Sequence, residues 1–315
     1  MTTYVIRRLL QTIPTLLVAS IAVWLIVYAL PGDPATAIVG DNASPDAIAL
    51  ERVRMGLDQP LVAQYWTWLS NIFRGDFGHS YFGGEEVGSM IARRALPTFQ
   101  LGIVSFTFGI LLALPIAFFG ALMPRSIAAR MATVQSVLSL SIPTFWVGVL
   151  FILVFGVKLG WLPAVSDYHP LWEAPGEALK HLLLPSLTLG IFVSGIFGRF
   201  LRQSLSETLD KDYVRTARAK GMREGFVVGR HALRNALLPF VTVVGLQFGT
   251  FIGGSVVTET VFNYPGIGRM LFTAISQRDY VVIQGTTLMI IAVVTFINLF
   301  VDVIYAYLDP RISYG

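Results

Sequence analysis

The sequence predicts an all-α integral membrane protein with six transmembrane helices and a helical segment outside the membrane between the first two. Of its 315 residues, 54% are hydrophobic and only 13% are charged, a composition far from that of soluble domains. Six mostly apolar stretches are long enough, at about 20 residues, to cross a bilayer. They cover residues 9–30, 99–122, 132–157, 182–200, 239–261 and 284–307.

The first stretch follows Arg7-Arg8 and stays apolar to Leu30. It is longer than the apolar region of about 7 to 15 residues in a signal peptide, so we expect an uncleaved span. Pro115 and Pro143 predict kinks in the second and third spans. The fourth stretch is the shortest and carries Pro185 and several glycines.

Basic residues predict the orientation. The N-terminus, the turn at 125–130, the loop before the fifth span and the C-terminus hold 14 of the 23 Lys and Arg. Such an excess marks the cytoplasmic side, so both termini are expected there. Asp302, near the inner end of the last span, is placed to pair with an Arg on that side.

The segment at 31–98 then lies outside. Leu30-Pro31-Gly32-Asp33-Pro34 cannot continue the first span as a helix and must turn. Ser44 followed by Pro45 predicts a helix start, with the helix running to about Met55. A second helix is predicted from Pro60 to Phe73, and one face of it is apolar: Leu61, Tyr65, Trp68, Leu69, Ile72 and Phe73. This face suits core packing or anchorage at the membrane surface.

The fifth span is rich in small and polar residues. Gln247, Gly253, Ser255 and Glu259 are candidates for a substrate pathway or gate, because polar groups at membrane depth face protein or water. The alternative is that the glycines only permit close helix packing and that Glu259 already lies outside the membrane.

Several kinds of chemistry are absent from the sequence. It contains no Gly-rich phosphate loop, no His-Glu-x-x-His, no Gly-x-Ser-x-Gly and no Cys, and its four His lack metal-ligand spacing. We therefore expect no catalytic site, no metal site and no bound cofactor. The net charge of +4 arises from basic residues beside apolar spans, so nucleic acid is not an expected partner.

The loop at 201–239 is the most basic part of the chain. From Arg199 to Pro239 there are nine Lys and Arg against four acids. A short helix is predicted from Asp212, as its N-cap, to Gly221, followed by a second helix from about Glu224 to Asn235. By composition alone this loop could simply fix the topology.

The loop also resembles a known signature. Its run DYVRTARAKG, followed by RHALRNALLP, is similar to the cytoplasmic loop of bacterial ABC importer permeases, in the form found in the dipeptide, oligopeptide and nickel branch. In the general pattern Glu-Ala-Ala, three residues, Gly, nine residues and Ile-x-Leu-Pro follow one another. Of these, Ala217, Gly221 and Leu233 match outright. The resemblance extends over nearly the whole chain, and the first, B-type permease subunit is the most similar.

This resemblance implies a type I ABC importer permease fold and a coupling helix that docks on a separate ATPase. The residues that it places in this coupling role are Arg215, Thr216, Ala217, Arg218, Ala219, Lys220, Gly221, His231, Arg234 and Pro239. Ala217 and Gly221 would let the partner backbone come close, and Arg218 and Lys220 would pair with acids across the interface.

The implied partners are a second homologous permease, two ABC ATPases that hold ATP and Mg, and an extracytoplasmic substrate-binding protein. The resemblance offers docking of this binding protein on the 31–98 segment as an alternative to packing. The implied location is the bacterial cytoplasmic membrane. The expected cargo is a di- or oligopeptide, or a related small solute such as glutathione or nickel. A stand-alone secondary carrier or channel is the alternative, although it predicts a charge within the spans or an inverted repeat.

The chain accordingly divides into four parts. Residues 1–30 form the N-terminus and first span, and 31–98 form the outer segment. Residues 99–308 form a five-span core that includes the 201–239 loop, and 309–315 form a cytoplasmic tail.

Overall fold

The computed structural model describes residues 2–29, 33–40 and 42–308, and the tail at 309–315 lies outside this range. The described residues are mostly helical and contain no β-strand, only an isolated bridge between His79 and Glu86. The helices are α1 Thr2–Ala29, α2 Pro34–Val39, α3 Pro45–Arg54, α4 Leu61–Phe73, α5 Val87–Leu122, α6 Ile127–Ser141, α7 Thr144–Phe151, the π-helix η1 Ile152–Lys158, α8 Pro175–Leu209, α9 Asp212–Ala219, α10 Glu224–Phe226, the π-helix η2 Val227–Leu233, α11 Arg234–Val261, α12 Ile267–Gln277 and α13 Tyr280–Leu308.

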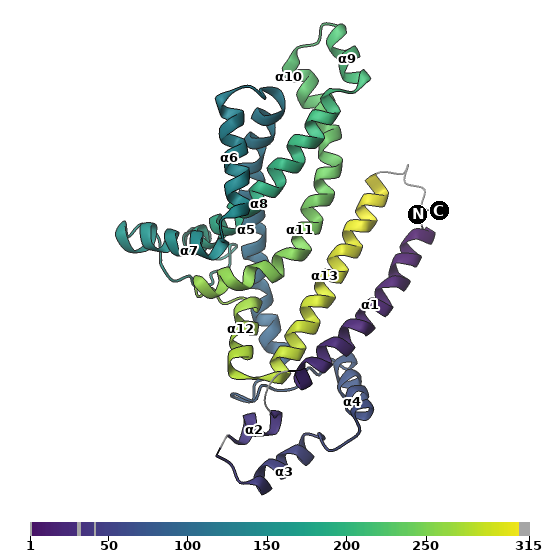
Figure 1. Ribbon diagram of the computed structural model, residues 1–315, viewed down its shortest axis with the longest axis vertical. Coiled ribbons are helices and arrows are strands. Elements are labelled where there is room, and N and C mark those ends of the chain that lie inside the picture. The colour runs from purple at the N-terminus through teal and green to yellow at the C-terminus, as the bar shows by residue number, and fades with distance from the viewer. Residues whose placement is uncertain (1, 30–32, 41, 309–315) are drawn as a thin grey trace.

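Five of these helices are long and apolar enough to cross a membrane: α1, α5, α8, α11 and α13. They run along one bundle, with α9 projecting at one end and α2, α3 and α4 gathered at the other (Figure 1). We refer to these as the α9 end and the α4 end. The six predicted spans thus correspond to five continuous helices and one broken span, formed by α6, α7 and η1.

The broken span corrects the expectation of a single kinked helix at 132–157. Its two halves differ in direction by 102°. The physical cause is Pro143, which disfavours helical geometry at the residue before it and holds Ile142 extended, with φ −89° and ψ 128°. As a result α7 leaves the bundle sideways (Figure 1).

The core of the bundle lies where α5, α8 and α11 meet. Phe106, Phe197 and Phe251 are buried there, with edge-to-face rings whose centroids lie 5.6 Å and 5.5 Å from the Phe106 ring. Small residues bring α5 and α8 together: a Cβ on Gly190 would lie 3.1 Å from the Ser105 carbonyl oxygen. The stretch at 182–200, the shortest of the six, lies inside the 35-residue helix α8 because polar residues extend that helix at both ends.

The first and last spans pack side by side (Figure 1). The Arg8 Nε lies 3.3 Å from the Asp302 Oδ2, so the ion pair expected for Asp302 is present. This contact joins the two helices toward the end at which α1 begins and α13 finishes.

The segment between α1 and α5 contains the two predicted helices and a short third one, α2. Ser44 caps α3 by accepting a hydrogen bond from the Ala47 N–H, and Pro60 precedes the first residue of α4, as predicted. The helix α4 rests on α1: the Tyr65 and Ser20 hydroxyls lie 2.9 Å apart, and Leu69 is buried. Leu61 and Phe73, at its two ends, remain exposed.

Candidate functional site

The helix α9 is short and ends where a glycine allows it. Lys211 is its N-cap residue, which corrects the prediction that Asp212 would be, and Asp212 lies in the first turn where its charge favours the helix dipole. Gly221 follows the helix with φ +75°, a left-handed conformation that side chains disfavour. This agrees with the predicted break.

The two faces of α9 differ. Val214 and Ala217 are buried in a cluster formed with Leu205, Val227, Val228 and Ala232 of the same chain. The Ala217 methyl group therefore packs against other residues of this chain. It is not exposed for the close approach of a partner backbone that was expected at this residue. The exposed face carries the other residues expected to couple: Arg215, Thr216, Arg218, Ala219, Lys220 and Gly221.

Two side-chain contacts fix α9 to the helices α10 and α11. Arg218 donates to both oxygens of the Glu224 carboxylate, at 2.6 Å and 3.1 Å, and these bonds hold the pKa of that carboxyl below its usual range. The Asn235 amide, at the start of α11, donates to the Tyr213 hydroxyl at 3.0 Å. A displacement of α9 would therefore reach α11 directly.

After the break at residues 220–223, the helices α10, η2 and α11 follow one another without interruption. His231 lies in η2 with its ring edge-on to Phe226, at 5.9 Å between centroids. Arg234 is exposed at the first position of α11, and Pro239 is exposed within that helix. The widened turn in η2 is the irregular element between the projecting loop and the long span.

Farther along α11, the pathway candidates separate into two pairs. Gln247 lines a cavity of about 340 Å³ beside the bend of the broken span, where Thr250 and Gly254 also lie. The Thr250 hydroxyl donates to the Gln247 side-chain oxygen at 2.7 Å. Gly253 is exposed, and a Cβ built on it would meet no atom within 4 Å. This face of α11 is open.

Ser255 and Glu259 lie on another face of α11, and neither has any exposed surface. The Glu259 Oε1 accepts hydrogen bonds from the Thr98 hydroxyl at 2.8 Å and the Ser255 hydroxyl at 3.2 Å. Its Oε2 accepts the Arg269 N–H at 2.9 Å, and the Gly268 N–H also donates to this carboxylate. The charge of Glu259 is thus fully hydrogen-bonded inside the protein.

The Glu259 carboxylate caps the start of α12. The first backbone donors of a helix have no partner within it, and a negative charge there is favourable. Here the Ile267 N–H donates to the Thr98 hydroxyl at 2.8 Å, and the next two N–H groups donate to Glu259. We call Thr98, Glu259 and the 266–269 backbone the carboxylate clamp. It joins α5, α11 and α12 at the α4 end.

The partners of Glu259 in this clamp were not predicted from the sequence. Thr98 lies at the edge of the second predicted span, and no feature of the sequence around it indicated a contact with Glu259. The glycine at position 266 is a feature of the sequence that fits this contact, because a Cβ there would overlap the Glu259 carboxylate. Tyr264, just before it, donates its hydroxyl to the Pro97 carbonyl at 3.3 Å, and burial raises the pKa of this phenol.

Two further buried side chains hold loops at the α4 end and were also missed. The Gln100 amide donates to the His169 carbonyl at 2.8 Å and accepts the Leu171 N–H at 3.1 Å, so the loop before α8 is tied to α5. Asp279 accepts the Ser80 hydroxyl at 2.5 Å and thereby joins the turn before α13 to the segment before α5.

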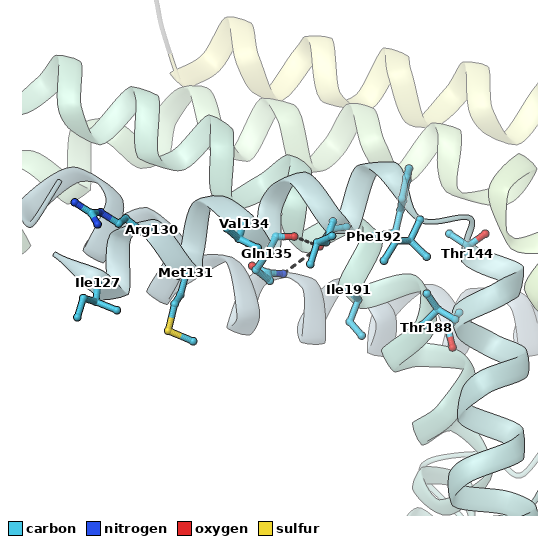
Figure 2. Close-up of a pocket in the computed structure, with 13 residues that line it drawn as sticks. Ile127, Arg130, Met131, Val134, Gln135, Thr144, Thr188, Ile191 and Phe192 are labelled. Carbon is cyan, nitrogen blue, oxygen red and sulfur yellow. Dashed lines mark hydrogen bonds between the residues drawn. The ribbon is translucent and has the colours of Figure 1, made fainter. Parts of the chain in front are cut away.

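Figure 2 shows a wider groove of about 520 Å³ along α6 and α8. Apolar side chains such as Met131, Val134 and Ile191 line most of it, and Arg130 lies toward one end. Its central amide, Gln135, donates to the Ser194 hydroxyl at 2.9 Å, within the bundle. Across residues 2–29, 33–40 and 42–308, no group of three or more His, Asp or Glu could hold a metal ion.

Two family models match the chain. Residues 105–314 match the binding-protein-dependent transport system inner membrane component, and residues 1–102 match the N-terminal part of the membrane component of such systems. The glutathione transport system permease protein GsiC of Escherichia coli K12 is 44% identical over 314 residues, covering all of both chains. GsiC of Salmonella typhimurium LT2 matches equally well.

Solved structures show the same fold. The MetNI methionine ABC transporter, in an inward facing conformation, aligns with a TM-score of 0.58 at 18% identity over 70% of this chain and 96% of the other. An amino acid ABC transporter aligns with a TM-score of 0.50 at 16% identity over 71% of this chain and 94% of the other. These matches confirm the type I permease fold and disfavour a stand-alone carrier or channel. The chain belongs to the family of binding-protein-dependent transport system inner membrane components, as an ABC importer permease of the dipeptide, oligopeptide and nickel type whose ATPase is a separate subunit.

Proposed function

We propose that this chain forms half of the translocation pathway of an ATP-driven importer for glutathione or small peptides. The observation that best supports this proposal is the full-length 44% identity to permeases of glutathione transport systems. The second half would come from a homologous but different permease, and the cargo from an extracytoplasmic binding protein that docks at the α4 end. ATP and Mg would be bound by two partner ATPases.

The α9 end lies in the cytoplasm in this proposal, as do both termini, and the membrane is the bacterial cytoplasmic one. The distribution of basic residues supports this orientation. The exposed face of α9 then meets the ATPase. Closure of the ATPases would push α9, and the Asn235 to Tyr213 bond and the helical path through η2 would carry this movement to α11.

The open face of α11, with Gln247 and Gly253, is the pathway side in this proposal. The cavity on this face, into which Gln247 and Thr250 bring polar groups, adjoins the bend of the broken span, where the backbone need not stay helical. Ser255 and Glu259 do not line the pathway in this proposal. They hold α12 in place behind the open face of α11 and so support the gate. Alternating access would then be a population shift driven by ATP binding.

The experiment is reconstitution with co-expressed partners. The chain is purified in mild detergent, its companions are identified by mass spectrometry, and uptake of labelled glutathione and a labelled dipeptide is measured in proteoliposomes. A second permease, two ATPases and ATP-dependent uptake of either cargo would support the proposal. Recovery of the chain without companions, or only with further copies of itself, in several detergents would contradict the proposal.

Ala219→Trp tests the coupling role, because Ala219 is exposed on α9. A matched control is Gln203→Trp, at an exposed position of α8. We expect Ala219→Trp to lose the ATPases during purification while the control keeps them. Equal retention of the ATPases by both variants would remove α9 from the interface.

A further inference from the structure

A small cavity at the α4 end has the character of an anion site. It measures about 220 Å³ and lies between α12, the first turns of α5 and the segment around Ser80. Met90, Met270 and Val282 form its apolar part, and Thr273 and Gln277 supply polar groups. Two half-buried arginines, Arg94 of α5 and Arg269 of α12, also line it.

These two arginines lack the carboxylate partner that three other arginines at the same end have. Arg52 pairs with Asp33, Arg54 with Glu51 and Arg93 with Glu85. Within the described part of the chain, neither Arg94 nor Arg269 forms an ion pair. Arg269 uses one nitrogen, Nη1, to donate to the Asn263 carbonyl at 2.9 Å. A guanidinium stays protonated and carries five donors, so most of this capacity is left for a ligand.

The nearby acids are already engaged. Asp279 also lines the cavity, but its Oδ2 accepts the Ser80 hydroxyl and its Oδ1 faces the Val282 N–H. Both oxygens of Glu259 accept hydrogen bonds within the carboxylate clamp. Neither acid can turn to neutralise the arginines without giving up the bonds that hold α12 and α13.

The carboxylate clamp also brings the two arginines together. Arg94 lies four residues before Thr98 and therefore on the same face of α5. The backbone N–H of Arg269 itself donates to Glu259, whose other oxygen binds Thr98. The backbone positions from which the two side chains extend are thus fixed before any ligand arrives, which lowers the entropy cost of binding.

We propose that the Arg94 and Arg269 cavity binds a carboxylate group of the transported molecule as it enters the permease. Arginine binds carboxylates with two parallel hydrogen bonds, and the Gln277 amide can donate to a further oxygen, whereas the Thr273 hydroxyl already donates to the Arg269 carbonyl. The cavity is smaller than the roughly 300–1,000 Å³ of a site that encloses a whole small ligand, so it holds one end of the cargo. This inference rests on the proposed function, since glutathione and peptides both carry carboxylates.

Chemical protection tests the site without requiring transport. The purified complex is treated with phenylglyoxal, which modifies arginines, and labelling is followed residue by residue with mass spectrometry. S-methylglutathione, which has no thiol to consume the reagent, is compared with its diethyl ester. The acid should slow labelling of Arg94 and Arg269 by about tenfold at saturation, the ester should not, and exposed Arg74 should be unaffected. Equal protection by the acid and the ester would overturn the proposal, because the carboxylates would then not be what is bound.

A second pair of probes separates the site from the cargo. Alanyl-alanine is compared with its C-terminal amide in the same assay. Protection by the dipeptide alone would keep the site and remove glutathione as the cargo. Failure of all four probes to protect would remove the site, even where uptake shows that the transport proposal holds.

Uptake by variants gives the functional counterpart. In proteoliposomes with the binding protein, Arg94→Gln and Arg269→Gln should raise the KM for the acidic cargo about tenfold, and Arg74→Gln should not. ATPase stimulation by the cargo-free binding protein should stay unchanged. Loss of that stimulation would indicate that the arginines bind an acidic residue of the binding protein and not the cargo. It would overturn the proposal.

Discussion

The Glu259 carboxylate and the Thr98 hydroxyl, 161 residues apart in the sequence, meet at 2.8 Å in the interior of the protein. The same hydroxyl accepts the first backbone N–H of α12. One short side chain of α5 therefore connects the end of α11 to the beginning of α12. The position of α12, and of every group that it carries, depends on this contact.

Replacement of Thr98 by valine should weaken this connection. Valine keeps the shape but leaves the Ile267 N–H without its acceptor, at a cost of roughly 1–3 kcal/mol, and leaves the Glu259 Oε1 with the Ser255 hydroxyl alone. We expect a lower melting temperature for the purified chain and slower uptake. Thr107→Val on the same helix is the control, because its exposed hydroxyl donates only to the Ile103 carbonyl. Equal melting temperatures for both variants would contradict the role of Thr98.

Gly266→Ala tests the same clamp from the backbone side. The added Cβ would overlap the Glu259 carboxylate, and overpacking of this kind costs typically about 1–3 kcal/mol. The φ of −95° at Gly266 suits any residue, so the effect is one of space. We expect lost uptake with insertion into the membrane retained. Gly176→Ala, where a Cβ meets nothing within 4 Å, should behave as wild type, and normal uptake by Gly266→Ala would contradict the geometry.

The orientation can be measured with single cysteines, because the chain has none of its own. Trp172→Cys lies in the exposed loop before α8, and Lys220→Cys follows α9. In intact spheroplasts a membrane-impermeant maleimide should label only Trp172→Cys. Lys220→Cys should react after permeabilisation. Labelling in the reverse order would invert the topology.

The Arg218 to Glu224 pair predicts a pH dependence of the loop around α9. Because the pKa of Glu224 is lowered in the folded chain, the contribution of the pair is present above the ordinary Glu pKa and is lost as the pH falls through the folded value. NMR of the labelled carboxyl should show titration at a lower pH in wild type than in Arg218→Gln. Both groups are largely exposed, so the stability change is small. Identical titration curves would contradict the pairing in solution.

The sequence alone predicted most of the architecture, because the signals involved are local. Apolar length predicts spans, so the predicted stretches fall within α1, α5, α8, α11, α13 and the broken span. Capping residues such as Ser44 act within a few positions, and α3 begins where predicted. The runs from Asp212 to Gly221 and from Arg230 to Pro239, within a resemblance over nearly the whole chain, identified the family, and the family match confirms it.

Contacts between distant segments were decided only by the tertiary structure. Ala217 looked like a docking residue and is buried, because the chain folds η2 back against α9. Pro143 looked like a kink and produces a turn of 102°. Glu259 was a candidate for the substrate pathway or gate and is the cap of α12, because Thr98 and the 266–269 backbone come to it from other helices. Hydropathy and charge bias depend on residue type along the chain, whereas a buried carboxylate needs several donors that only folding assembles.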